Sequence, residues 1–448
     1  MRRAIRVLRC WALRVLHARS LIGSCALLAA LLSASQSAHA QGIFLTGTGP
    51  INQSMGGAAV AAPLDSAGAL NWNPATISGL SRSEMALALG VVIPQASVSS
   101  SIQGIGAAGS TDSAQGVTPV PTMSFVLKDP DSIFTWGIGV YGIGGFSSNY
   151  PSNAIGPGAN PLLTPQPPFG WGIGRVYSMA QIYQIAPTMS VALTDKLSFG
   201  FAPTIDLANA QIDPLVLAPP TNATSSPYYG PGTGSKFSWG GGFQLGVYYI
   251  INPSWRVGAS YKSMQWFEPL QYQSNDAIGN PVFGRVRVDL PSITSVGASY
   301  TGIERMVWAV DVRYFDYADA AGFKQSGYLP DGAVAGLGWR SVVGVSNGVQ
   351  YSLTDRFDLR AGYTYIDCPI PSSQTQANIA TSLIMRNFLS LGASYRIRRN
   401  VMANVAYTHG FTTSLTGPYV YSGGVVPDAS VSSRVTVDWI QAGLTVQF

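Results

Sequence analysis

The chain has 448 residues, of which 46% are hydrophobic and only 10% are charged. Ordinary soluble proteins carry roughly 25% charged residues, so the charge content is too low for a typical soluble surface of this size. The aromatic share of 11% argues against disorder, and three cysteines exclude a disulfide-rich scaffold. The net charge of +5 does not indicate nucleic-acid binding, because six of the 26 basic residues lie in residues 1–40 and all 21 acidic residues follow them.

Residues 1–40 have the three parts of a secretory signal peptide. An arginine-rich start precedes an apolar core, Leu21–Leu32, and the small-residue end Ala38-His39-Ala40. The apolar core is shorter than the roughly 20 residues that cross a bilayer, which disfavours a membrane anchor. We therefore expect cleavage after Ala40 and export of a mature chain with Cys368 as its only cysteine.

The next segment, residues 41–82, is rich in glycine and alanine and precedes the first long strand pattern. It is too short for an ordinary independent domain. Its small side chains would allow it to pack closely against the walls of a wide barrel. We expect an N-terminal hatch, or plug, within the lumen; an unstructured periplasmic tail is the alternative.

From Ser83 onward, apolar and polar residues alternate with the period of a β-strand. Between Phe357 and Tyr365, for example, every second residue is apolar or aromatic. The segments are longer than strands of soluble sheets, and many carry Trp or Tyr near an end, as membrane-spanning strands do. We therefore expect residues 83–448 to form an all-β, transmembrane antiparallel β-barrel, since closure pairs every backbone group in lipid.

The pattern predicts about 14 strands, an even number as bacterial barrels have. The expected strands are 83–98, 119–128, 133–146, 179–193, 196–212, 236–251, 255–272, 284–300, 305–317, 340–351, 357–366, 385–396, 400–411 and 434–448. Short turns, expected on the periplasmic side, alternate with long loops rich in Pro, Gly, Ser and Asn, which should face outward. The expected long loops are 147–178, 213–235, 318–339, 367–384 and 412–433.

Several short motifs, in the same order along the mature chain, resemble the FadL/TodX family of outer-membrane transporters of hydrophobic compounds. Asn73, Pro74 and Ala75 match the hatch signature of that family. The other motifs are Ser54–Ala58 with Asp65, Asn71–Trp72, Val120–Phe125, Asp289–Pro291, Asp367–Pro371, Tyr407–Gly410 and the terminal Phe448. No single motif is specific, but their collinearity covers nearly the whole mature chain.

The resemblance implies a barrel of fourteen strands plugged by the hatch. Members of this family pass long-chain fatty acids or aromatic hydrocarbons. It further implies that long outer loops first capture the ligand, which then enters an interior pocket. The ligand leaves sideways into the membrane through a gap at an inward kink of the third strand.

Two groups of residues are candidates for these roles. Glycines crowd the third strand, and glycine weakens strand pairing and marks bulges; a generic glycine-rich strand is the alternative. The expected wall opening comprises Gly142, Gly144, Gly145 and Phe146. Apolar residues in two long loops suggest an outer capture groove, although loop-on-loop packing would also explain them. These residues are Leu162, Leu163, Phe169, Trp171, Leu215 and Leu217.

The ligand head group is the point at which this chain departs from the family pattern. Fatty-acid-binding members place basic residues inside, but Pro214 stands at one of those positions; Lys324 aligns with the other. Losing one basic group weakens the case for a carboxylate and strengthens that for a neutral hydrocarbon. Lys324 is the candidate head-group residue.

Enzymatic chemistry is not expected, and we expect no catalytic residue, metal or cofactor. His409 is the only histidine after the leader, so a zinc site of ordinary composition cannot form. A Ser-His-Asp hydrolase would have to use His409 and is a minor alternative.

We expect a monomeric outer-membrane barrel in contact with lipid and lipopolysaccharide, which takes up hydrophobic small molecules by passive, ligand-gated diffusion. Long-chain fatty acids are the leading cargo and monoaromatic hydrocarbons the second. In this hypothesis, ligand binding shifts residues 41–44 and opens a path to Gly145. A non-transporting structural or adhesive barrel and a non-specific porin are the alternatives.

Overall fold

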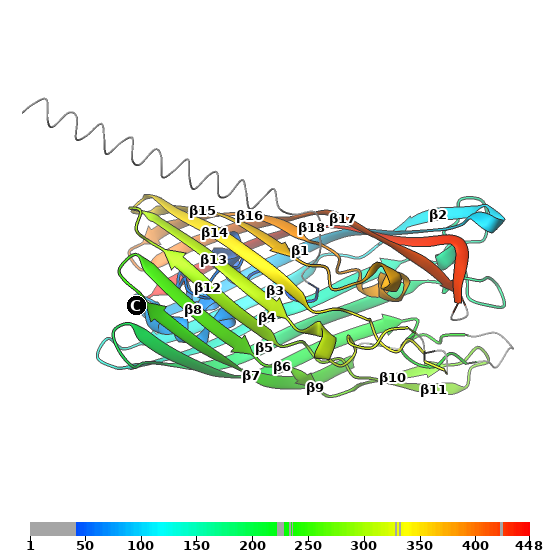
Figure 1. Ribbon diagram of the computed structural model, residues 1–448, viewed down its shortest axis with the longest axis horizontal. Helices are drawn as coiled ribbons and strands as arrows, with labels where there is room; N and C mark the ends of the chain where they lie inside the picture. Colours follow the sequence, from blue (N-terminus) through cyan, green and yellow to red (C-terminus); the bar gives the residue numbers. More distant parts are fainter. Residues whose placement is uncertain are drawn as a thin grey trace, which may run out of the picture. The chain divides into compact units, whose positions relative to one another are not determined.

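Antiparallel strands form a closed ring in which β18 pairs with β1 along its length (Figure 1). The computed structural model describes residues 42–221, 228–232, 234, 236–327, 329–330, 333–421 and 424–448. Within these residues the ring has 14 strands, which confirms the predicted barrel. The predicted signal peptide lies outside the described residues.

The barrel strands are β1 (Glu84–Ile102), β3 (Thr118–Lys128), β4 (Phe134–Tyr150), β5 (Val176–Ala192), β6 (Leu197–Asp213), β7 (Lys236–Ile250), β8 (Trp255–Lys262), β12 (Ile293–Tyr300), β13 (Met306–Phe315), β14 (Val342–Thr354), β15 (Phe357–Ile366), β16 (Asn387–Arg398), β17 (Val401–Tyr421) and β18 (Gly424–Gln447). The other strands are β2 (Ala107–Asp112), β9 (Trp266–Phe267), β10 (Leu270–Asn275) and β11 (Pro281–Val286). The short helices are α2 (Gly49–Ser54), α3 (Ser66–Trp72), η1 (Pro74–Gly79), η2 (Gln103–Ile105), η3 (Pro161–Leu163), η4 (Tyr317–Asp319), η5 (Ser372–Gln374) and η6 (Gln376–Thr381).

Alternation along the strands, except in the outer parts of β17 and β18, separates an apolar outer face from a largely polar inner face. On β16, Leu389 and Leu391 are exposed, whereas Ser390 and Ser394 are buried in the lumen. An outward apolar band and a polar interior are the pattern of a barrel whose outer surface contacts lipid. None of the described helices is long and apolar enough to span a membrane.

Three predicted segments have wrong bounds. The predicted strand 284–300 is divided between β11, which pairs with β10, and the barrel strand β12. The segment 412–433, predicted as a loop, continues β17 and β18 into a long hairpin. Most of its exposed side chains are polar, with exceptions such as Tyr421 and Val425, and Thr412 pairs with Thr436, so the continuous apolar signal of a membrane strand is missing. The predicted strand 255–272 is divided into β8, β9 and β10, and β10 pairs with β11 in a separate two-stranded sheet.

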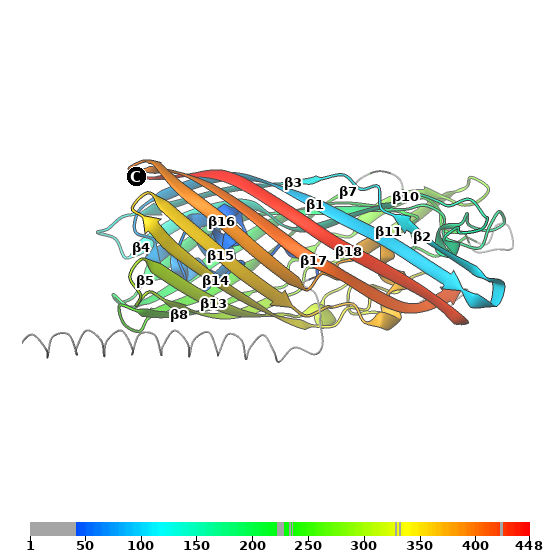
Figure 2. The same cartoon turned by 90° about the horizontal axis from the view of Figure 1, so that it is seen from above.

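Residues 42–82, here called the hatch segment, form α2, α3 and η1 and lie inside the ring at the end that holds the C-terminus (Figure 1 and Figure 2). The Asp65 side chain accepts a hydrogen bond from Gly68 N at the start of α3. Asn73 begins η1 by accepting from Ala75 N, with Pro74 in the first helical position. These are ordinary helix-start signals, so the local sequence specifies these short helices.

The hatch segment approaches the strands closely because glycines face it. A Cβ on Gly246 would lie 2.0 Å from Asn73 Oδ1, and one on Gly362 would lie 2.1 Å from Gly56 N. A buried ion pair adds polar contacts: Asp311 Oδ2 accepts from Ala59 N at 2.7 Å and from Val60 N at 3.0 Å. Its partner Arg313 donates to Gly57 O as well as to Asp311.

Candidate functional site

The third barrel strand, β4, loses its neighbour on one side halfway along its length. β4 pairs with β3 from Thr135 to Tyr141, and within the described residues this ladder goes no further. Beyond this point β3 continues to pair with β1, while β4 continues to pair with β5 up to Tyr150. The backbone ladder of the wall is therefore interrupted between β3 and β4.

A β-bulge lies at the start of this interruption. The register of β4 against β5 shifts between Gly142 and Gly144, which leaves Ile143 as the extra residue. Strand side chains alternate between the two faces of a sheet with period two. One extra residue therefore moves every following side chain of β4 to the opposite face of the wall. Trp136 and Ile138, before the bulge, are exposed on the outer surface, whereas Phe146, after it, lines the interior.

The first residues of the hatch segment pair with β4 at the bulge. Leu45 N donates to Ile143 O at 3.0 Å, and Gly145 N donates to Ile43 O at 3.1 Å. A Cβ on Gly144 would lie 2.4 Å from Ile43 O, so only glycine permits this approach. Residues 43–45 thus supply from inside the backbone partner that β3 does not supply.

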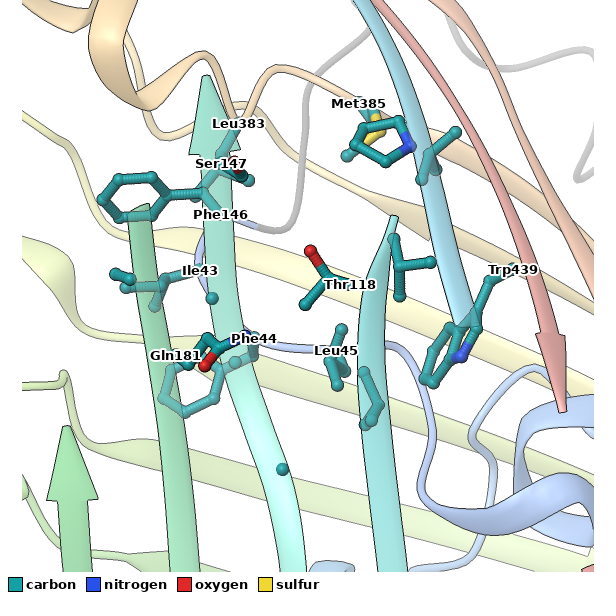
Figure 3. A pocket seen from close by; sticks show the side chains of 18 of the residues that line it. Ile43, Phe44, Leu45, Thr118, Phe146, Ser147, Gln181, Leu383, Met385 and Trp439 are labelled. Carbon is teal, nitrogen blue, oxygen red and sulfur yellow. The ribbon is translucent and has the colours of Figure 1, made fainter. Parts of the chain in front are cut away.

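A cavity of about 140 Å³, here called the inner cavity, lies at this junction (Figure 3). Hatch residues 42–46, the bulge of β4 and Trp439 of β18 contribute to its lining. Among the described residues that line it, none is Asp, Glu, Lys, Arg or His. The inner cavity is therefore a largely apolar space with uncharged polar groups.

A second cavity, of about 510 Å³ and here called the outer cavity, adjoins it on the side of the long loops. Ile43 and Phe146 line both cavities and so form a shared partition. Two arginines, Arg285 and Arg287, are among the residues that line the outer cavity. Arg287 pairs with Asp289 at 3.1 Å, whereas no ion pair joins Arg285 to the residues that the structure describes.

A groove on the outer face of the barrel lies beside the interruption. It is lined by apolar side chains of β18, β1 and β3, including the exposed Leu89 and Met123, together with Tyr141 and Tyr183. Tyr183 also lines the inner cavity. Three spaces therefore adjoin one another in sequence: the outer cavity, the inner cavity and a groove on the face that contacts lipid.

The residues predicted for the wall opening, Gly142, Gly144, Gly145 and Phe146, lie together at the bulge. Asn73 of the predicted hatch signature does not line the opening. Its side chain donates to Val60 O at 2.7 Å and to Val247 O at 3.0 Å, and so joins the hatch segment to β7.

The residues predicted for an outer capture groove are not brought together. Leu162 and Leu163 are fully buried in a cluster with Tyr150, so they follow the loop-packing alternative. Leu215 is buried in another cluster, and Leu217 packs against that same cluster and also lines the outer cavity. Phe169 is 81% exposed and Trp171 is 37% exposed.

Lys324, the predicted head-group residue, is exposed and lines neither cavity. Sequence reasoning did not single out Arg285, Tyr183 or Trp439. Trp439 could have been noticed, because it is an aromatic residue on the inward register of β18, where polar residues prevail. Among the described residues, no cluster of His, Cys, Asp or Glu could hold a metal ion.

His409 faces the outer surface of the barrel. Its Nδ1 lies 2.8 Å from Asp438 Oδ1, and the hydroxyl of Tyr407 donates to the same oxygen at 2.6 Å. No hydrogen bond joins His409 to a serine hydroxyl within the described chain, so the hydrolase alternative lacks its nucleophile there.

A closed barrel with an apolar outer band, an internal hatch and adjoining apolar cavities defines an outer-membrane transport protein for hydrophobic small molecules. The chain belongs to the family described as "Outer membrane protein transport protein (OMPP1/FadL/TodX)", whose model matches residues 29–419. It is accordingly an outer-membrane protein and not an enzyme.

Similar proteins fall into two groups by their names. A long-chain fatty acid transport protein of Escherichia coli O157:H7 is 23% identical over 407 residues, covering 80% of this chain and 85% of that protein. A FadL homologue of Pseudomonas aeruginosa has a TM-score of 0.69 at 14% identity, covering 91% of this chain and 100% of the other. The Pseudomonas putida toluene transporter TodX has a TM-score of 0.64 at 18% identity, covering 90% and 99%.

Proposed function

We propose that this protein takes up hydrophobic small molecules by passive diffusion and releases them sideways into the membrane at the bulge of β4. The observation that carries the proposal is the interrupted ladder between β3 and β4, with a cavity on its inner side and an apolar groove on its outer side. A lateral exit suits an apolar ligand, because lipid offers it a lower free energy than water.

Residues 41–82 act in this proposal as the hatch, following a signal peptide of residues 1–40 and preceding the barrel of residues 83–448. Residues 43–45 close the inner side of the gap through two backbone hydrogen bonds. Each such bond stabilises by only about 0.5–1.5 kcal/mol net, so a ligand in the adjoining cavity can displace the segment. Ligand binding would thereby open the gate.

Long-chain fatty acids remain the leading cargo. Arg285 supports this choice, since it lines the outer cavity and can pair with a carboxylate. Several similar proteins are named long-chain fatty acid transport proteins. Monoaromatic hydrocarbons are the second candidate, favoured by the absence of charge in the lining of the inner cavity. We further propose that the barrel works as a monomer in contact with lipid and lipopolysaccharide.

A reversible disulfide across the gap tests the lateral exit. A Cβ on Gly142 would lie 3.0 Å from Val120 Cγ1, close to the Cβ–Sγ separation of about 3 Å that a disulfide requires. The double variant Val120→Cys/Gly142→Cys should lose uptake of labelled oleate and toluene when oxidised and regain it on reduction. Each single variant is the control. Full uptake by the oxidised double variant would exclude this exit.

Two further measurements address the alternatives. A non-specific porin would give a large, steady single-channel current in the intact protein, whereas a plugged barrel should not. A structural or adhesive barrel would show no hydrocarbon uptake, and deleting residues 42–80 would not change that. Competition for a fluorescent fatty acid by oleate and then by toluene separates the two cargo classes.

A further inference from the structure

The inner cavity holds an unusual set of polar groups. Thr46 Oγ1, both side-chain polar atoms of Gln115 and Trp439 Nε1 are shielded from solvent and have no hydrogen-bond partner within the described chain. All three residues line the inner cavity. They come from the hatch segment, the connection between β2 and β3, and β18, respectively.

Unpaired buried polar groups are rare in native proteins, and each one calls for an explanation. Here the three lie around one cavity, which Figure 3 shows with Trp439 on the side opposite Ile43 and Phe146. The amide of Gln115 can donate and accept, the hydroxyl of Thr46 can do both, and the indole of Trp439 can only donate. Together they can pair with an uncharged oxygen.

Charge is disfavoured at the same place. No basic side chain of the described residues lines the inner cavity, so an ionised carboxylate would be buried there without a counter-charge from them. Burying an unpaired charge is far more costly than burying a paired polar group. A pure hydrocarbon avoids that cost but leaves the three polar groups unpaired.

We propose that the inner cavity is a binding site for hydrophobic molecules that end in an uncharged, hydrogen-bonding oxygen, such as aliphatic alcohols. This inference rests on the proposed uptake function and names the ligand class of one site within it. The oxygen pairs with one or more of the unpaired groups of Gln115, Thr46 and Trp439, and a chain too long for the inner cavity extends past Ile43 and Phe146 into the outer cavity.

The test compares three ligands of equal chain length on the purified full-length mature protein in detergent: 1-decanol, decane and decanoate at pH 8. Each displaces the neutral fluorophore N-phenyl-1-naphthylamine, with concentrations expressed as mole fractions in the micelle. We expect decanol to displace the probe at about tenfold lower mole fraction than the other two, as one added hydrogen bond to an unpaired buried group would give.

Gln115→Leu and Trp439→Phe should each reduce the preference for decanol over decane while leaving decane binding in place. The matched control is Gln441→Leu, since Gln441 also has a buried side-chain amide without a hydrogen-bond partner within the described chain but does not line the inner cavity. It should keep most of the preference. Retention of circular dichroism and heat-modifiable migration verifies that each variant is folded.

Equal displacement by decanol and decane would overturn this inference alone, because water would then satisfy the three polar groups. A preference that survives in both Gln115→Leu and Trp439→Phe would overturn it too. If none of the three ligands displaces the probe, both this inference and the proposed uptake function are wrong.

Discussion

Substituting Gly144 by alanine should detach the first residues of the hatch segment from β4. The added Cβ would lie 2.4 Å from Ile43 O, so the segment must move by about 1 Å to reach ordinary van der Waals contact. The hydrogen bonds from Leu45 N and Gly145 N, now 3.0 and 3.1 Å, would then exceed hydrogen-bonding distance.

Losing two backbone hydrogen bonds costs about 1–3 kcal/mol, which raises the ratio of detached to docked segment roughly 5- to 150-fold. Hydrogen–deuterium exchange of the peptide that contains Leu45 measures this ratio directly. Gly144→Ala should exchange faster by that factor and should also take up labelled substrate faster, because the gap loses its inner cover.

The neighbouring variant Gly142→Ala is the control. Its Cβ would meet only Val120 Cγ1, at 3.0 Å, and would not touch the hatch segment. Exchange of the peptide that contains Leu45 should therefore stay near the wild-type value in Gly142→Ala. If Gly144→Ala behaves like Gly142→Ala, residues 43–45 do not cover the gap and the gating argument fails.

Three further substitutions test other contacts. Burial, together with the nearby Glu84 carboxyl group, raises the pKa of Asp65 from 3.8 to about 7, so the docked hatch should lose stability as the pH rises from about 4 through 7. The unfolding temperature should therefore be lower at pH 8 than at pH 5.5. Asp65→Asn keeps a helix-capping oxygen and should make the unfolding temperature less dependent on pH. Asp311→Ala should lower the free energy of unfolding by about 3–5 kcal/mol, because Arg313 is left buried and unpaired. The control Asp355→Ala removes one partner of an exposed ion pair and should lower it by less than about 1 kcal/mol in the same thermal assay. Arg285→Gln should weaken oleate competition about tenfold and leave toluene unchanged; equal loss of both would show that Arg285 does not bind a carboxylate.

Much of the barrel could be predicted because lipid imposes a strict alternation on its outer face. β15, for example, was predicted as 357–366 and has those bounds. Prediction failed where that constraint ends: the outer parts of β17 and β18 carry outward threonines, and a polar strand without an apolar face resembles a loop. The glycine-rich stretch Gly142–Gly145 did indicate a bulge, since glycine is the residue that tolerates it.

The cavities were beyond prediction for a different reason. The inner cavity joins residues of the hatch, β4 and β18 that are separated by several hundred positions, and only the register of the closed ring brings them together. Apolar loop residues carry a further ambiguity. Leu162 and Phe169 look alike in the sequence, yet one is buried and the other is exposed, because burial depends on the distant strands that surround the loop.

The glycines that face the hatch make some contacts of that interface unequal in mutational tolerance between the two sides. At Gly246 and Gly362 the barrel presents bare backbone, so any side chain there would push the hatch out of its seat. The hatch atoms that contact Gly362 belong to the main chain of Met55 and Gly56, so this contact does not depend on the side chain at position 55. A saturation library should therefore tolerate replacements at Met55 better than at Gly362, whereas the hatch positions Gly56 and Asn73, which depend on their own backbone geometry or side-chain contacts, should be as restricted as the strand glycines.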